Sequence, residues 1–338
     1  MIDIAGKLLA AYCAHGGINV AAYATLEKLD IIYYAFGKVS GTDIVFNYPE
    51  DLKRIKQIKA DHPHIKVILS IGGGGCALNM TEATLNDDNF YKVTNNIFKT
   101  MLYNGFDGID LDWEFPTVTG HPEEKQKHTE MLKTLREKIN NLQGNYTLSV
   151  ACPDGLWTFK ITELEKSHLY LDYINVMTYD MTDFHFTSHH TAPYSSSGSA
   201  CFVPRSVYNS IQVFKEKGVP LEKILIGGAF YSKKWSNIKG GENGLGVYTD
   251  VDVSYGPSVS EIRNNYINKN GYRHFWDERA QAPYLYDGDT FITYDDERSL
   301  KCKCGMVKSE KTGGIMIWEL SGDKEQILLP QMREWIDN

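Results

Sequence analysis

The segment Phe106–Glu114 combines an apolar strand pattern with four acidic side chains, which are the residues best suited to chemistry. Side chains alternate between the faces of a β-strand, so Asp110, Asp112 and Glu114 share one face, roughly 6.5–7 Å apart along the chain. The alternate positions are apolar and suit packing against helices: Ile109, Leu111 and Trp113. Burying three carboxylates is costly unless they share protons or meet partners. The segment therefore predicts a catalytic site.

The three acids predict a division of roles. Glu114 lies next to Asp112 in a water-poor pocket, so its pKa should be raised and it should act as a general acid. Asp110 and Asp112 should share a second proton as a coupled pair. Asp107 has the opposite parity, so we expect it to support the backbone or the neighbouring acids.

The spacing also limits the reaction, if the protein cleaves glycosidic bonds. Double displacement needs an acid and a nucleophile on opposite sides of the sugar carbon, and two carboxylates from one strand flank that carbon poorly. We therefore expect the nucleophile to belong to the substrate. The carbonyl oxygen of an N-acetyl group can attack the anomeric carbon and give a cyclic oxazolinium, with Asp112 orienting the acetamido N–H.

Eight short apolar runs alternate with helical stretches, which is typical of an α/β fold and predicts a (β/α)8 TIM barrel. The runs are Leu8–Cys13, Ile31–Phe36, Val67–Ile71, Phe106–Glu114, Tyr146–Cys152, Ile174–Tyr179, Ile224–Phe230 and Ile315–Trp318. Helical spacing of apolar residues between Glu123 and Leu142 supports this prediction. Catalytic groups of such barrels lie at the carboxyl ends of the strands, where Glu114 stands.

The long interval before the last strand predicts an inserted unit. Residues 233–297 are dense in aromatic and β-branched side chains. This composition indicates a small α+β subdomain between strands 7 and 8, forming one wall of a cleft. We expect residues 1–338 to form a single catalytic barrel domain that carries this insertion.

Composition excludes several classes of protein. The net charge is −8 and no basic stripe occurs, which argues against nucleic-acid binding. No run of eighteen apolar residues is present, so no membrane span is expected. We expect a monomer located outside the cell, with any leader removed.

Several ordered motifs carry a resemblance to a known family. The run from Asp107 to Glu114 reads DGxDxDxE, and Ser70–Gly73, Met177–Asp180 and Trp318 follow at other strand ends. In these motifs the chain resembles family 18 glycoside hydrolases, the chitinase family. The insertion is similar to the chitinase insertion subdomain in three motifs: Trp276–Asp277, Pro283–Tyr286 and Phe291–Asp296.

The resemblance implies a role for each matching residue. Glu114 would be the proton donor, assisted by Asp112 and Asp110, and Tyr179 would bind the acetamido oxygen. Asp180 and Met177 would line the same pocket, whose floor would be Trp318. The implied substrate is chitin or N-acetylglucosamine oligosaccharides, cleaved at β-1,4 bonds with retention, and the implied reaction needs no metal or organic cofactor.

Further residues are assigned by their positions near strand ends. Gly73 and Gly74 lie in a glycine run without the spacing of a phosphate-binding loop, and we expect them to form the cleft floor. Aromatic residues that could extend the sugar track are Tyr12, Phe36, Tyr231, Trp157 and Trp235. Each of these aromatic residues would serve equally well as a simple packing residue.

Two positions depart from the family pattern. Many chitinases have a tryptophan where this chain has Gly74, and an arginine near the tyrosine that follows the seventh strand, where this chain has Tyr231-Ser232-Lys233. Both changes affect the predicted binding of the leaving group. Three alternatives stay open: an endo-β-N-acetylglucosaminidase acting on N-glycan cores, a non-catalytic chitin-binding lectin, and a metal-dependent barrel hydrolase using Asp110 and Asp112 as ligands.

Overall fold

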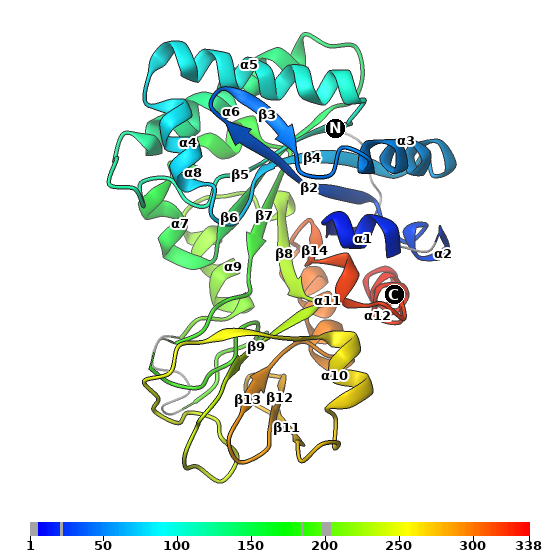
Figure 1. Cartoon of the computed structure of the whole chain (residues 1–338), viewed down its shortest axis with the longest axis vertical. Helices are drawn as coiled ribbons and strands as arrows, with labels where there is room; N and C mark the ends of the chain where they lie inside the picture. Colours follow the sequence, from blue (N-terminus) through cyan, green and yellow to red (C-terminus); the bar gives the residue numbers. More distant parts are fainter. Residues whose placement is uncertain (1–5, 21–22, 184, 198–203) are drawn as a thin grey trace.

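A closed barrel of eight parallel strands organises the molecule (Figure 1). The computed structural model describes residues 6–20, 23–183, 185–197 and 204–338. The barrel strands are β1 (Leu8–Cys13), β2 (Ile31–Ser40), β4 (Lys66–Gly72), β5 (Gly108–Asp112), β6 (Thr147–Pro153), β7 (Tyr173–Met177), β8 (Ile224–Ala229) and β14 (Gly314–Trp318). Neighbours follow the order β1-β14-β8-β7-β6-β5-β4-β2, and pairing between β1 and β2 closes the ring. The predicted TIM barrel is confirmed.

The strand that carries the acids is shorter than predicted. β5 ends at Asp112, so Glu114 lies two residues beyond the strand and does not close it. Parallel pairing with β4 and β6 accounts for this end, because the register stops at Asp112 on one side and at Leu111 on the other. The turn that follows gives Glu114 a position above the end of the barrel.

Helices cover the outside of the barrel, except for α10, which belongs to the inserted unit. Their bounds are α1 (His15–Val20), α2 (Tyr23–Leu26), α3 (Asp51–Asp61), α4 (Ala77–Thr84), α5 (Asp87–Asn104), α6 (Glu124–Asn140), α7 (Gly155–Ile161), α8 (Leu164–Ser167), α9 (Val207–Glu216), α10 (Val259–Asn265), α11 (Glu297–Ser309) and α12 (Leu328–Asp337). The helix predicted between Glu123 and Leu142 is α6, which buries Met131, Leu132, Leu135 and Ile139. None of the helices in the described ranges combines the length and hydropathy that a bilayer span requires.

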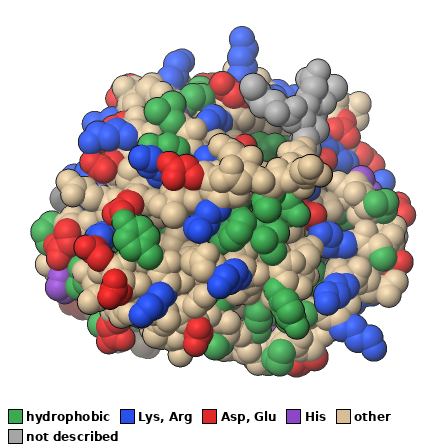
Figure 2. All heavy atoms as spheres, turned by 90° about the horizontal axis from the view of Figure 1, so that it is seen from above, with side chains coloured by type: hydrophobic (Ala, Val, Ile, Leu, Met, Phe, Trp, Pro, Cys, Tyr) green, Lys and Arg blue, Asp and Glu red, His purple; other side chains and the backbone are tan. Residues whose placement is uncertain are grey.

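The strands bury both faces, as their near-continuous apolar runs require. Ile109, Leu111 and Trp113 belong to the large cluster between strands and helices, as predicted. A separate cluster fills the barrel interior with Tyr12, Tyr33, Ile68, Met316 and smaller neighbours. Figure 2 shows basic and acidic side chains interspersed on one face of the molecule.

A second, antiparallel sheet lies below the barrel in Figure 1. Its strands are β9 (Tyr231–Trp235), β10 (Ser254–Ser258), β11 (Arg273–Asp277), β12 (Ala282–Tyr286) and β13 (Phe291–Thr293), in the order β10-β9-β13-β12-β11. With α10 they form the predicted α+β unit between the seventh and eighth barrel strands. The sheet begins at Tyr231, two residues before the predicted start of the insertion. The limits of the inserted subdomain, residues 233–297, remain a prediction.

A β-hairpin was missed by the sequence prediction. β2 continues past Phe36 to Ser40 and pairs antiparallel with β3 (Asp43–Phe46). The continuation carries Lys38 toward the acids at the end of β5.

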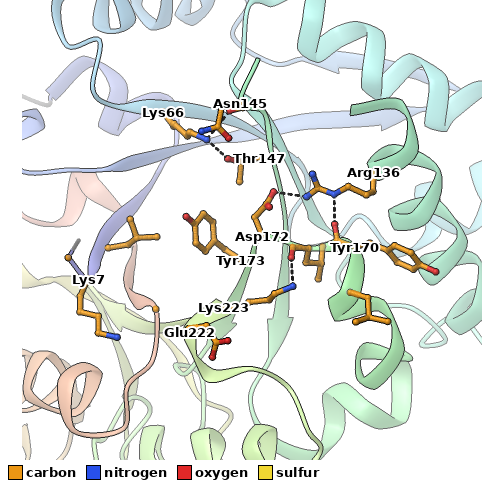
Figure 3. Close-up of a pocket in the computed structure, with 15 residues that line it drawn as sticks. Lys7, Lys66, Arg136, Asn145, Thr147, Tyr170, Asp172, Tyr173, Glu222 and Lys223 are labelled. Atoms are coloured by element: carbon orange, nitrogen blue, oxygen red, sulfur yellow. Dashed lines mark hydrogen bonds and ion pairs between the residues drawn. The ribbon is translucent and has the colours of Figure 1, made fainter. Parts of the chain in front are cut away.

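The other end of the barrel contains a cavity of about 620 Å³ among the amino-terminal ends of the strands (Figure 3). Arg136 pairs with Asp172 at 2.5 Å and donates to the carbonyl of Tyr170 at 2.7 Å. Lys66 and Lys223 donate to backbone carbonyls of neighbouring loops. These contacts hold the loops of this end together. Since Glu114 follows the carboxyl end of β5, this cavity is not the candidate active site.

A fully buried ion pair connects the inserted unit to the barrel. Lys303 of α11 and Asp295, which follows β13, approach to 2.6 Å and are both 0% exposed. Asp295 also accepts from the Ala229 amide at the end of β8, and Lys303 donates to Thr191. The pair therefore joins α11, β8 and the loop after β7.

Lys303→Met should lower the free energy of unfolding by about 3–5 kcal/mol, because it leaves the Asp295 carboxylate buried without its cation. Chemical denaturation measures this change. The matched control is Lys301→Met on the exposed face of the same helix, which should change stability by no more than about 0.5 kcal/mol. Equal effects of the two variants would contradict this role for the pair.

Candidate active site

Asp110 is held at the centre of the barrel by four hydrogen-bond donors. Ser70 and Tyr12 donate to Oδ2 at 2.8 and 2.9 Å, and Ser149 and Asn175 donate to Oδ1 at 2.7 and 3.2 Å. Ser70 and Ser149 stand beside Asp110 in the register of β4 and β6. Burial raises the pKa of Asp110 above its usual value, and these four hydrogen bonds oppose the rise.

Asp112 has the opposite environment. It is 2% exposed, and no described residue donates a hydrogen bond to its Oδ1. Burial first, and then the charges of Glu114 and Asp110, raise the pKa of Asp112 well above its usual value. A buried carboxyl oxygen without a partner is costly, and it can accept a hydrogen bond from a ligand.

Glu114 is half-buried above Asp112. Its backbone N–H points to Cys76 Sγ at 3.3 Å, and the Cys76 thiol lies 3.5 Å from the carbonyl oxygen of Asp112. Burial, followed by the charge of Asp180, raises the pKa of Glu114 to about 7. The side chain can therefore hold a proton near neutral pH and release it, as a general acid and base must.

Lys38 brings a positive charge to the acids. Its Nζ donates to the carbonyl of Gly72 at 2.7 Å and lies 4.6 Å from the centre of the Phe36 ring. This charge opposes the rise in the pKa of both Asp112 and Glu114. Lys38 thus belongs to the electrostatic environment of the site.

Opposite shifts in the pH profile should follow from removing the two charges that act on Glu114. Lys38→Met removes a cation, so the pKa of Glu114 should rise and the alkaline limb of kcat/KM should move to higher pH. Asp180→Asn removes an anion, so the limb should move to lower pH. Lys56→Met, which removes the same charge from an exposed position of α3, should leave the limb in place. If the alkaline limb moved in the same direction in Lys38→Met and in Asp180→Asn, a group other than Glu114 would control the pH profile.

Asp180 is engaged on both carboxyl oxygens. Tyr231 donates to Oδ1 at 2.6 Å, and Lys233 lies 3.2 Å from Oδ2. Burial alone would raise the pKa of Asp180, but His190, Tyr231 and Lys233 outweigh it and lower the pKa to about 2. Asp180 therefore stays ionised at neutral pH and places a fixed negative charge near Glu114.

Tyr179 is buried between these groups and the barrel interior. Its ring meets Tyr231 edge-on at 6.0 Å. Among the described residues the one hydrogen-bond partner of the hydroxyl is the Met316 sulfur, at 3.9 Å, which is a weak partner. The hydroxyl is thus available to a ligand, and the charges of Asp112 and Glu114 act on it after burial to raise the pKa of Tyr179.

Aromatic rings form the adjoining surface. Trp318, at the end of β14, stacks on Phe36 at 5.6 Å, and both are partly exposed. Met177 is partly buried against the interior cluster. Tyr12 is 1% exposed, and its hydroxyl donates to Asp110, so direct sugar contact is a wrong expectation for this residue. Its location indicates that it positions Asp110 instead.

The two predicted glycines differ in what they provide. Gly73 has a φ of 82°, and a Cβ there would come within 2.4 Å of the Phe36 ring, so a side chain is excluded. A Cβ on Gly74 would lie 4.0 Å from Oε1 of Glu114 and near no other atom within that distance. The space beside Glu114 is therefore open.

Comparison with known proteins adds to this geometry. The model of the family described as "Glycosyl hydrolases family 18" matches residues 9–323. The chain belongs to this family. The family 18 chain is 32% identical over 308 residues to chitinase A1 of Niallia circulans, covering 84% of this chain and 44% of that protein. It is 28% identical over 315 residues to chitinase 63 of Streptomyces plicatus, covering 89% and 50%.

A solved structure extends the likeness over almost the whole chain. The structure of a family 18 N-acetylglucosaminidase from Paenibacillus barengoltzii is 32% identical, with a TM-score of 0.91, and the match covers 97% of this chain and 99% of that one. In contrast, the chain spans about half the length of the curated relatives described above.

The structure brings most of the predicted residues of the family 18 chain into one region. Hydrogen bonds, ring contacts or electrostatic interactions link Asp110, Asp112, Glu114, Tyr179, Asp180, Tyr231, Trp318 and Phe36. Sequence reasoning missed the residues that surround the acids: Lys38, Ser70, Cys76, Ser149, Asn175 and His190. Ser70 lay within a recognised motif, but the other residues carried no signal in the sequence.

Proposed function

We propose that this chain hydrolyses β-1,4 bonds between N-acetylglucosamine units, with net retention and with the substrate's own acetamido group as nucleophile. The proposal rests on two neighbouring carboxyl groups. The pKa of Glu114 is about 7, and the buried Oδ1 of Asp112 has no hydrogen-bond partner among the described residues. An acid and an acceptor for an N–H are the two groups that this reaction requires.

The first step forms a ring within the substrate. Glu114 gives its proton to the glycosidic oxygen, the bond from that oxygen to the anomeric carbon breaks, and the acetamido carbonyl oxygen bonds to the same carbon. Asp112 accepts a hydrogen bond from the acetamido N–H, and its negative charge offsets the positive charge of the oxazolinium. The Tyr179 hydroxyl donates to the acetamido oxygen and helps to align it with the anomeric carbon.

The second step restores the catalyst. Glu114, now ionised, takes a proton from a water molecule whose oxygen attacks the anomeric carbon. The bond from the acetamido oxygen to that carbon breaks, and the product has the starting configuration. Asp180 is a poor rival nucleophile, because Tyr231 and Lys233 already occupy its two oxygens.

The relatives support the substrate class and also favour a second candidate activity. Curated relatives are described as chitinases, which supports chitin or its oligosaccharides as substrate. One solved structure that matches almost the full length of both chains, at 32% identity, is described as an N-acetylglucosaminidase. Release of single N-acetylglucosamine units is therefore the second candidate, and an extracellular monomer remains our expectation for the protein.

Product analysis on N-acetylglucosamine oligosaccharides of defined length, with detection of the anomer first released, tests the proposal. We expect β-anomers at the new reducing ends and no dependence on chelators. A ladder of dimers and longer products supports chitinase action, whereas successive monomers support the second candidate. Binding without cleavage would favour a lectin. Cleavage confined to N-glycan cores would favour an endo-β-N-acetylglucosaminidase, and loss of activity in chelator would favour a metal-dependent hydrolase.

A further inference from the structure

The inserted sheet carries an exposed aromatic ring to the rim of the proposed site. Tyr255 of β10 pairs with Lys233 of β9 across the sheet, and the Lys233 ammonium lies 3.6 Å from the centre of the Tyr255 ring. Even so, Tyr255 is 66% exposed. The ring therefore has one face covered by a cation and another face open.

Tyr255 is connected to the reacting pocket through Tyr231. The Tyr255 and Tyr231 rings are 5.6 Å apart, and Tyr231 meets Tyr179 at 6.0 Å. Lys233 forms an ion pair with Asp180, which also accepts a hydrogen bond from the Tyr231 hydroxyl. These contacts fix the position of Tyr255 although its ring is exposed.

The leaving sugar needs a surface close to Glu114, because Glu114 protonates the oxygen that joins this sugar to the reacting unit. Gly74 stands beside the Glu114 carboxyl and offers no side chain there. Partial burial, followed by the charges of Asp180 and Glu114, raises the pKa of Tyr255. The ring is therefore within electrostatic reach of both acids.

We propose that Tyr255 determines specificity on the leaving side of the scissile bond, where its open face stacks on the first departing N-acetylglucosamine unit. The apolar C–H face of a sugar packs well on an aromatic ring. This inference rests on the proposed function and adds to it the residue that binds the leaving sugar. Lys233 acts as a positioning residue, since it holds the opposite face of the ring.

Two substrates separate leaving-side binding from the rest of the reaction. N-acetylchitotetraose places sugars on both sides of the broken bond, whereas β-chitobiosyl fluoride has a leaving group without a ring. Tyr255→Ala should lower kcat/KM for the tetrasaccharide roughly 3- to 10-fold, as expected for a lost stacking contact, mainly through KM. The rate on the fluoride should stay within about twofold of wild type.

Two further variants complete the experiment. Tyr255→Phe keeps the ring and should restore the rate on the tetrasaccharide. Tyr248→Ala removes another exposed tyrosine of the inserted unit, one that contacts His185 and Asp250, and should match wild type on both substrates.

The outcomes are distinct for this inference and for the function on which it rests. If wild type cleaves neither substrate, the proposed function is wrong. If wild type cleaves both and Tyr255→Ala slows neither, or slows both equally, the assignment of Tyr255 to the leaving side is wrong.

Discussion

Glu114→Gln should lower kcat on N-acetylglucosamine oligosaccharides by about 10²–10⁴-fold, the range for a lost general acid. Glutamine keeps the shape of the side chain but cannot give a proton to the glycosidic oxygen. Binding should survive, since the rings and Asp112 are unchanged. Steady-state kinetics with calorimetric titration of the tetrasaccharide measures both quantities.

The control for this prediction is Glu137→Gln, which makes the same change at an exposed position of α6. It should leave kcat within about twofold of wild type, because surface substitutions far from the site change little. Near-normal turnover by Glu114→Gln would require another proton donor and would overturn the assignment.

Asp112→Asn is expected to have the second-largest effect, a loss of about 10²–10³-fold in kcat, comparable with removal of one group that stabilises transition-state charge. Asparagine cannot offset the positive charge of the oxazolinium. In contrast, the substitution should not lower the stability of the folded state. Because the folded state raises the pKa of Asp112, its ionisation opposes folding at pH values above the unfolded pKa of about 4. The melting temperature of Asp112→Asn near neutral pH should therefore equal or exceed that of wild type.

Asp107→Asn is the matched control within the same motif. The Asp107 carboxylate pairs with Lys59 at 2.7 Å and accepts from the Val67 amide at 2.9 Å, on the side predicted from its parity. Its replacement should affect stability more than kcat. If Asp107→Asn and Asp112→Asn lower kcat equally, the special role of Asp112 is contradicted.

Much of the fold followed from local pattern. Apolar runs and their spacing predicted all eight barrel strands, because strands buried on both faces leave a strong hydrophobic signal. Parity within β5 placed Asp110 and Asp112 inward and Leu111 outward. The end of β5 was wrong by two residues, because the hydrogen bonds to β4 and β6 decide where a strand stops, and these are not local.

The surroundings of the acids could not be predicted in the same way. Ser149 and Asn175 reach Asp110 from β6 and β7, and only the register of the closed barrel brings them there. Lys38 depends on the unpredicted continuation of β2 into the hairpin with β3. Such residues look like ordinary polar residues in sequence, so their pairing becomes visible only when the strands are assembled.

Lys303 illustrates the same difficulty in a helix. A lysine is usually expected at the surface, yet this side chain is fully buried with Asp295. Its partner lies eight residues earlier, outside α11, and the helical pattern gives no indication of the contact. Tyr255 is similar, because its relevance depends on the cross-strand position of Lys233.

The most direct measurement compares initial rates on N-acetylchitotetraose and on cellotetraose, which has a hydroxyl at C2 in place of the acetamido group. If the acetamido oxygen bonds to the anomeric carbon, the loss of this internal nucleophile should reduce kcat/KM by at least about 10³-fold. Comparable cleavage of the two tetrasaccharides would mean that a side chain of the enzyme, and not the substrate, is the nucleophile.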